Sequence, residues 1–273
     1  MQNCPQVIVA YYAILRADAV VVPVSPMNVT EELEHYFDDS GARVALVGQE
    51  LFDRFAPLMG TRADHVIVAT YSDELTAATG MTVPDFVRAP RRVLDTPGAV
   101  AWVDALAGDH EPGPHRATAD DLGAILYTSG TTGQPKGCMH THRTLMPNVV
   151  GGGLWGHASA ETVSLAVVPM FHITGMVSVM HAAIYGGATL ILMPRWERDL
   201  AGRLQKLLSE WTGTRWVVSV SNAEGAPTLN QQMKDSQARL DKAMRFAAAV
   251  KAASKPPLLN PKETKVLLAL KLK

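Results

Sequence analysis

A run of glycine, hydroxyl and lysine residues between Tyr127 and Gly137 is the part of this sequence best suited to chemistry. It follows the apolar run 122–127 and reads YTSGTTGQPKG. Glycines let several backbone N–H groups converge on one anion, hydroxyls add short donors, and a lysine adds positive charge. The pattern predicts a strand that leads into a phosphate-binding loop. Its candidate ligand-binding residues are Thr128, Ser129, Gly130, Thr131, Thr132, Gly133 and Lys136.

The spacing in this loop disfavours a kinase or GTPase. A Walker A loop has Gly, four further residues and then Gly-Lys-Ser/Thr. Here Pro135 stands five places after Gly130, and Gly137 rather than a hydroxyl residue follows Lys136. The remaining alternative is a loop that only turns the chain, although turn chemistry alone seldom produces a strand–loop–Lys–Gly order of this length.

A second motif, VVPMFHITGM, covers residues 167–176. Pro169 ends a predicted strand, so Phe171 and His172 follow at its carboxyl end, where open α/β sheets place their ligands. A histidine beside Phe and Ile can also be a structural core or surface residue. The presence of the loop motif in the same chain favours a binding role for His172.

His140 and His142 suggest a metal site, because residues two apart on a strand share a face. No third and fourth ligand stands at convincing spacing, so we favour a structural interpretation. Thr141 is better placed to cap a helix from His142 to Val150 that contains Pro147, and the glycines 151–153 are expected to end that helix.

The elements that must position these motifs alternate between short apolar runs and helical patterns, which predicts an α/β fold of mainly parallel sheets flanked by helices. Asp18 is expected to adopt the left-handed turn that ends the first helix. The proline-rich stretch 71–121 is expected to connect an early lobe to the loop strand. Predicted strands are Val20–Val24, Val44–Val47, Val66–Ala69, Ala124–Tyr127, Ser164–Val168 and Ala188–Met193, and predicted helices are Pro5–Ala17, Thr30–Asp39 and Leu200–Trp211.

Composition fits a soluble enzyme of the cytoplasm. The 273 residues are 47% hydrophobic and carry a formal net charge of −1, which demands no nucleic-acid partner. The longest apolar stretch, Val7–Val24, contains Arg16 and Asp18 and lacks a basic lead-in, which disfavours a transmembrane segment or a signal peptide. Two cysteines form no disulfide framework, which favours a reducing compartment.

The two motifs together resemble the adenylate-forming (AMP-binding) superfamily, most closely its fatty-acyl-CoA synthetases. The resemblance implies part of an N-terminal adenylation domain and an ATP-dependent ligase that joins a carboxylic acid, such as a fatty acid, to coenzyme A with Mg²⁺. It implies that Ser129, Thr131, Thr132 and Lys136 bind the β- and γ-phosphates, that Thr128 lies near Mg²⁺, and that His172 lines the acyl pocket. No catalytic residue is assigned.

The resemblance covers about residues 5–216, so we expect a chain truncated at both ends relative to the family. The expected division is a partial AMP-binding domain over residues 1–225 and an atypical basic tail, helical or disordered, over residues 226–273. From Gln231 onward ten Lys or Arg residues stand against three acids. Two hypotheses remain: a ligase that is inactive alone, or completed by another chain, and a non-catalytic remnant that binds a nucleotide or an acyl group.

Overall fold

The computed structural model describes residues 1–75, 83–108, 110–128, 134–156 and 158–195, together with residues 202, 206, 209, 210 and 213. The chain divides into two compact units, Met1–Glu197 and Arg198–Lys273. The first unit contains every strand of the described residues and both sequence motifs. The predicted tail 226–273 lies outside the described residues.

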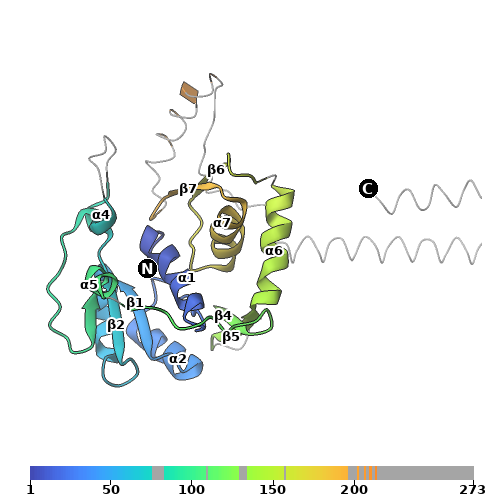
Figure 1. The fold of residues 1–273 in the computed structure, drawn as a ribbon. Helices are drawn as coiled ribbons and strands as arrows, with labels where there is room; N and C mark the ends of the chain where they lie inside the picture. The colour runs from blue at the N-terminus through green and yellow to red at the C-terminus, as the bar shows by residue number, and fades with distance from the viewer. Residues whose placement is uncertain are drawn as a thin grey trace, which may run out of the picture. The chain divides into compact units, whose positions relative to one another are not determined.

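A three-stranded parallel sheet forms one half of the first unit (Figure 1). Its order is β1 (Val44–Gly48), β2 (His65–Ala69) and β3 (Ala99–Ala101). The helices around it are α2 (Thr30–Ser40), α3 (Phe52–Phe55), α4 (Asp85–Arg88) and α5 (Trp102–Ala107), with short 3₁₀ turns at Gln49–Leu51, Ala56–Leu58 and Tyr71–Glu74. Alternate strand residues point into its core because successive side chains face opposite sides of a sheet. That core contains Val47, Phe52, Phe55, Leu58, Ala63, Val66 and Val68.

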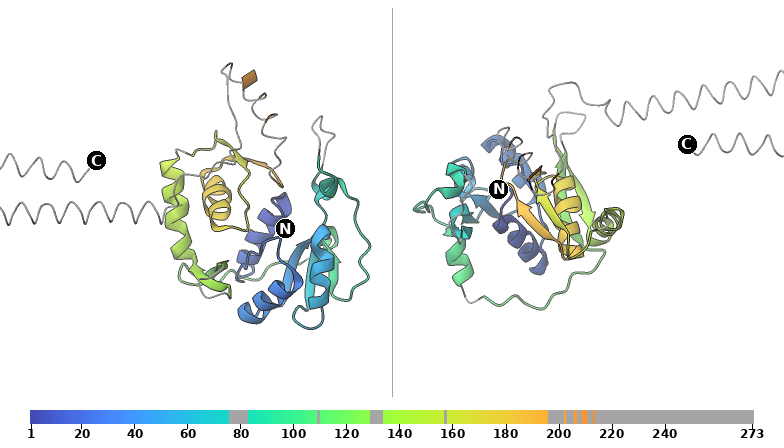
Figure 2. Two further views of the ribbon diagram at one scale, coloured as in Figure 1. Left: turned by 180° about the vertical axis from the view of Figure 1, so that it is seen from behind. Right: turned by 90° about the horizontal axis from the view of Figure 1, so that it is seen from above.

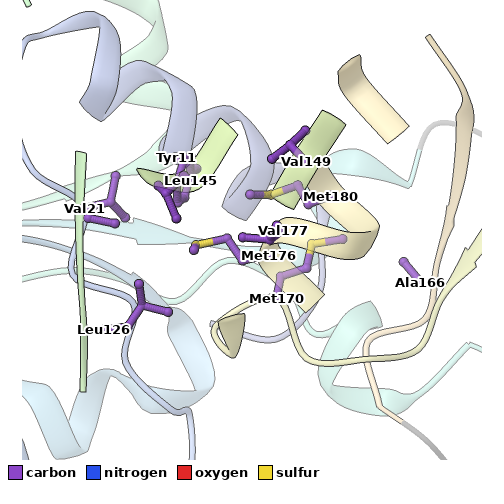
Figure 3. Close-up of a cluster of buried hydrophobic side chains, with 11 residues drawn as sticks. Tyr11, Val21, Leu126, Leu145, Val149, Ala166, Met170, Met176, Val177 and Met180 are labelled. Atoms are coloured by element: carbon purple, nitrogen blue, oxygen red, sulfur yellow. The ribbon is translucent and has the colours of Figure 1, made fainter. Parts of the chain in front are cut away.

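The other half is built on an antiparallel hairpin and a two-stranded parallel sheet. The hairpin pairs β4 (Leu122–Thr128) with β5 (Lys136–Thr141), and the parallel pair is β6 (Val163–Ala166) with β7 (Thr189–Leu192). They pack with α6 (His142–Trp155), the π-helical segment η4 (Gly175–His181) and α7 (Ala182–Gly186). Figure 3 shows the core that they share, which contains Tyr11, Val21, Ala124, Leu126, Leu145, Val149, Ala166, Met170, Met176, Val177 and Met180.

Helix α1 (Pro5–Arg16) joins these halves, and it lies between them in every view of Figures 1 and 2. Ala10 packs with Ala69 and Trp102 on the side of the parallel sheet. Its neighbour Tyr11 belongs to the core of the hairpin side. The helix ends at Arg16, and the chain turns away at Asp18, whose φ of 54° is the only positive value at a non-glycine position among the described residues. The predicted left-handed exit from this helix is therefore confirmed.

The predicted α/β class and most of the predicted elements are confirmed. Five of the six predicted strands and the first two helices are present, with bounds that shift by one or two residues. Val20–Val24 was predicted wrongly as a strand, because only Val21 forms an isolated bridge to Ala124. Pro23 has no N–H group with which to continue the pairing. Most of the predicted helix Leu200–Trp211 lies outside the described residues.

Helix α6 corrects a second expectation. Thr141 caps it as predicted, since the backbone N–H of Thr144 donates to the Thr141 hydroxyl at 3.2 Å. The glycines 151–153 do not end it, however, because the helix continues to Trp155. Glycine weakens a helix by about 1 kcal/mol without forbidding it, and buried Leu145 and Val149 anchor this helix in the core. Within the part of the chain that the structure describes, no helix combines the length and apolar character needed to cross a membrane.

Candidate phosphate-loop site

The hairpin β4–β5 presents the two described ends of the predicted phosphate loop side by side. Thr128 is the register partner of Lys136, and both residues are exposed. Ala124 and Leu126 pack one face of β4 into the core. The strand is therefore anchored by this face, while its last residue, Thr128, is exposed. Ser129, Gly130, Thr131, Thr132 and Gly133 lie outside the described residues.

Helix α2 contacts both strands where they enter the loop. The Tyr127 hydroxyl donates to Asp39 Oδ2 at 2.6 Å, and the rings of Tyr127 and Tyr36 lie 4.5 Å apart between centroids. Just before the other strand, β5, His35 Nε2 lies 3.1 Å from the carbonyl oxygen of Pro135. Loss of solvent around the Tyr127 phenol, together with its bond to Asp39, raises the pKa of Tyr127 above its usual value. Tyr127 is therefore a neutral hydrogen-bond donor at physiological pH.

His172 lies in a tight turn between β6 and η4. Its backbone N–H donates to the carbonyl of Pro169 at 3.1 Å, and its Nδ1 accepts from the Thr174 N–H at 3.3 Å. Gly175 closes this turn. The next residue, Met176, donates its backbone N–H to the His172 carbonyl at 2.9 Å. The imidazole of His172 is exposed. The turn thus fixes the backbone of His172 and leaves its ring accessible.

A single buried side chain, Asn3, holds the strand end that leads into this turn. Its Nδ2 donates to the carbonyls of Ala166 and Val168, each at 3.1 Å, and its Oδ1 accepts from the Met170 N–H at 2.8 Å. Asn3 is only 4% exposed. An amide side chain that satisfies three backbone groups in this way fixes the path of a segment that has no strand partner there.

The two motifs share one hydrophobic core. Leu126 stands two residues before Thr128, while Met170 and Met176 flank the turn of His172, and Figure 3 shows all three side chains in the same cluster. The structure therefore places the strand of the loop motif and the turn of the second motif in one half of the first unit. Among the described residues, the hydrogen bonds of the His172 side chain and backbone lie within its own turn.

The histidines around Thr141 belong to different elements. His140 lies on β5 as the register partner of Ala124, whereas His142 is the first residue of α6 and its ring lies against Gly123, where an added Cβ would meet it at 3.1 Å. Within the described ranges, no group of three or more His, Cys, Asp or Glu residues could hold a metal ion.

Sequence patterns did not identify His35, Asp39 and Asn3, although they hold the two motifs in place. Their partners lie 100, 88 and up to 167 residues away in the sequence. No local periodicity or motif links residues at such separations, so no signal in a single sequence could have found them.

Comparison with known proteins establishes the family. Residues 1–260 match the family model of the AMP-binding enzymes. The chain belongs to this family, which confirms the resemblance inferred from the two motifs.

The relatives are acyl-CoA ligases by name. The chain is 31% identical over 220 residues to a long-chain-fatty-acid–CoA ligase of Salmonella typhimurium, covering 76% of this chain and 38% of that protein. It is 30% identical to 4-coumarate–CoA ligase 2 of Oryza sativa subsp. japonica, covering 78% of this chain and 36% of that protein. The chain thus spans a little over a third of the length of these relatives.

Solved structures confirm the fold. A long-chain-fatty-acid-CoA ligase from Archaeoglobus fulgidus superposes with a TM-score of 0.58 at 24% identity, covering 76% of this chain and 37% of that one. Apo MatB from Rhodopseudomonas palustris gives the same TM-score at 22% identity, covering 77% and 36%. The described part of this chain therefore has the fold of part of an adenylate-forming enzyme.

Proposed function

We propose that this chain contributes the phosphate-binding loop and part of the acyl site of an ATP-dependent acyl-CoA ligase. The observation that carries the proposal is the hairpin β4–β5, which holds Thr128 opposite Lys136 at the start of a Gly/Ser/Thr loop, in a chain of the AMP-binding family. The substrate class is a carboxylic acid, such as a fatty acid, because the named relatives act on such acids.

The donors of the loop suit the phosphates of ATP. Lys136 offers a cationic ammonium and Thr128 a hydroxyl, both exposed at the same end of the hairpin. Ser129, Gly130, Thr131, Thr132 and Gly133 would add hydroxyl and backbone donors to the β- and γ-phosphates. Bound ATP supplies the adenylyl group that activates the carboxylate, and Mg²⁺, which we assign to the neighbourhood of Thr128, offsets phosphate charge.

These residues bind and orient the charged phosphates and form no covalent bond with the substrates. Donors held on a hairpin need little reorganisation when an anion binds, so they favour the approach of a carboxylate to a triphosphate. His172, exposed at the end of a turn anchored by Asn3, is proposed to meet the acyl substrate near its carboxylate. We assign no described residue to coenzyme A and no residue to catalysis.

The complete reaction is proposed for a larger assembly, because the chain spans only 38% of the Salmonella relative. Further protein segments or a complementing chain would supply the remaining contacts to the adenine, the ribose and the reacting phosphate. The same coverage supports the second candidate, a non-catalytic protein that binds a nucleotide or an acyl group. We expect the chain alone to show little ATP–pyrophosphate exchange, since loss of one fixed donor in such a site costs about 10²- to 10³-fold.

Two measurements test the proposal. MgATP or pyrophosphate should slow chemical labelling of Lys136, while labelling of the exposed Lys206 serves as the internal control. Gly130→Val should abolish this protection, because a side chain there blocks the approach of backbone donors to phosphate. Equal labelling of Lys136 with and without either ligand would contradict the phosphate assignment.

The second measurement separates the two candidates. ATP–pyrophosphate exchange is followed with Mg²⁺, coenzyme A and a panel of short, medium, long and aromatic carboxylic acids. Absence of exchange together with Lys136 protection supports a binding role for this chain alone. Robust exchange that a Lys136→Ala variant loses would mean that the chain carries a complete ligase site.

A further inference from the structure

Helix α2 uses one face to contact both strands at the mouth of the loop. His35 and Asp39 stand four residues apart, so their side chains lie one turn apart on the same face. Asp39 accepts the hydroxyl of Tyr127 from β4 at 2.6 Å. His35 Nε2 reaches the carbonyl of Pro135, the residue before β5, at 3.1 Å. One turn of one helix therefore meets both the entry and the exit of the loop.

The contact to Pro135 fills a gap that the hairpin itself leaves. The pairing of β4 with β5 ends at Thr128 and Lys136, and proline has no N–H with which to extend it. A carbonyl oxygen only accepts hydrogen bonds, so His35 Nε2 must carry the hydrogen in this contact. The ring also packs edge-on to Tyr127, with centroids 6.2 Å apart.

The contact from Tyr127 depends on an adjacent glycine. Gly137 is the register partner of Tyr127, and a Cβ there would lie 2.7 Å from Ile125 Cγ2 and 3.4 Å from Tyr127 Cζ. Without a side chain at this position, the Tyr127 ring has room across the hairpin and can direct its hydroxyl to α2. Tyr36, also on α2, packs against the same ring.

We propose that His35 and Asp39 are positioning residues that hold the two strands at the mouth of the loop, so that Thr128 and Lys136 keep a fixed separation for binding phosphate. The inference rests on the proposed function of the loop. It extends that function to α2, which contributes no donor to the phosphate itself. Preorganised donors bind an anion more tightly than donors that must first be ordered, which is the physical advantage of the arrangement.

The test uses the full chain and inorganic pyrophosphate as the probe. The measured quantity is the pyrophosphate concentration that halves the labelling rate of Lys136, relative to each variant without ligand. His35→Phe keeps an aromatic ring and removes the donor, whereas His35→Gln keeps a donor and removes the ring. Tyr127→Phe removes only the hydroxyl. Asp38→Ala is the matched control, because Asp38 lies next to Asp39 and pairs with Arg62 instead.

Each lost hydrogen bond should weaken pyrophosphate binding by about 2- to 10-fold. We expect that loss in His35→Phe and Tyr127→Phe, near-normal binding in His35→Gln, and normal binding in Asp38→Ala. A purely structural role of His35 in packing would give the reverse order for the Phe and Gln variants. Circular dichroism and urea denaturation of each variant show whether its fold is retained.

Amide hydrogen exchange over residues 122–141 in the absence of ligand measures directly how strongly α2 stabilises the two strands. Faster exchange in His35→Phe and Tyr127→Phe, with normal exchange in Asp38→Ala, supports the inference. Unchanged exchange and unchanged pyrophosphate binding in folded variants would overturn it. Failure of pyrophosphate to protect Lys136 in the unsubstituted chain would overturn the phosphate assignment, and with it the positioning role, even if exchange shows that α2 holds the hairpin.

Discussion

Gly175 closes the turn that carries His172, and replacing it with alanine should destabilise the first unit. A Cβ at this position would lie 2.1 Å from the carbonyl oxygen of Pro169, 2.6 Å from its carbonyl carbon and 2.8 Å from the carbonyl oxygen of Val168. All three obstacles are backbone atoms, so no side-chain rotation can relieve the overlap. The backbone of the turn would have to move.

The size of that backbone movement determines how much the free energy of unfolding falls. The contact to the Pro169 oxygen is about 1.3 Å short of the 3.4 Å at which ordinary van der Waals contact begins. Movement is resisted by Asn3, which is bonded to Val168 and Met170 on either side of Pro169. Overpacking typically costs 1–3 kcal/mol, and a net hydrogen bond about 1 kcal/mol. We expect Gly175→Ala to lower the free energy of unfolding by about 3 kcal/mol.

Urea denaturation followed by tryptophan fluorescence measures this change, with Gly151→Ala as the matched control. Gly151 lies inside α6, and a Cβ there would meet no atom within 4 Å. The same substitution should therefore raise stability at Gly151 by about 0.5–1 kcal/mol, because alanine favours a helix over glycine. A Gly175→Ala protein as stable as the unsubstituted chain would refute the close packing of this turn.

Two further predictions concern buried polar side chains. Asn3→Ala should lower the free energy of unfolding by about 2–3 kcal/mol, since it leaves the Val168 carbonyl and the Met170 N–H without their partner. The half-buried Asn28, whose amide donates only to the side chains of Glu32 and Tyr36, should cost much less when substituted in the same way, and equal losses would contradict this account. His181 is buried beside Tyr12, and desolvation lowers its pKa from 6.5 to about 4. The unfolded chain therefore takes up this proton first, so stability is lost as pH falls from about 6.5 to about 4, by roughly 3 kcal/mol in total. His181→Asn should flatten that part of the stability profile, measured by urea denaturation at several pH values, and an unchanged slope would show that His181 does not cause it.

The sequence alone determined the class of fold and the family. Alternating apolar runs and helical patterns located α1, α2 and five of the strands, because burial of one face imposes a short, local period on the residues. Asp18 and Thr141 also acted as expected, since a helix exit and a helix cap depend on a few adjacent residues. The loop and the aromatic–His motif were sufficient to indicate the AMP-binding family.

Only the tertiary structure decided how the two motifs are held. Asn3, His35 and Asp39 are ordinary polar residues in the sequence, and their roles arise from partners 88 to 167 residues away. Gly175 matters because the turn brings the carbonyl oxygen of Pro169, six residues earlier, to within 2.1 Å of where a Cβ would stand, which no propensity of the individual residues predicts. The helix α6 runs through three glycines because buried contacts outweigh a local propensity of about 1 kcal/mol each. Contacts between residues far apart in the chain leave no local pattern, so the fold had to be seen before these residues could be recognised.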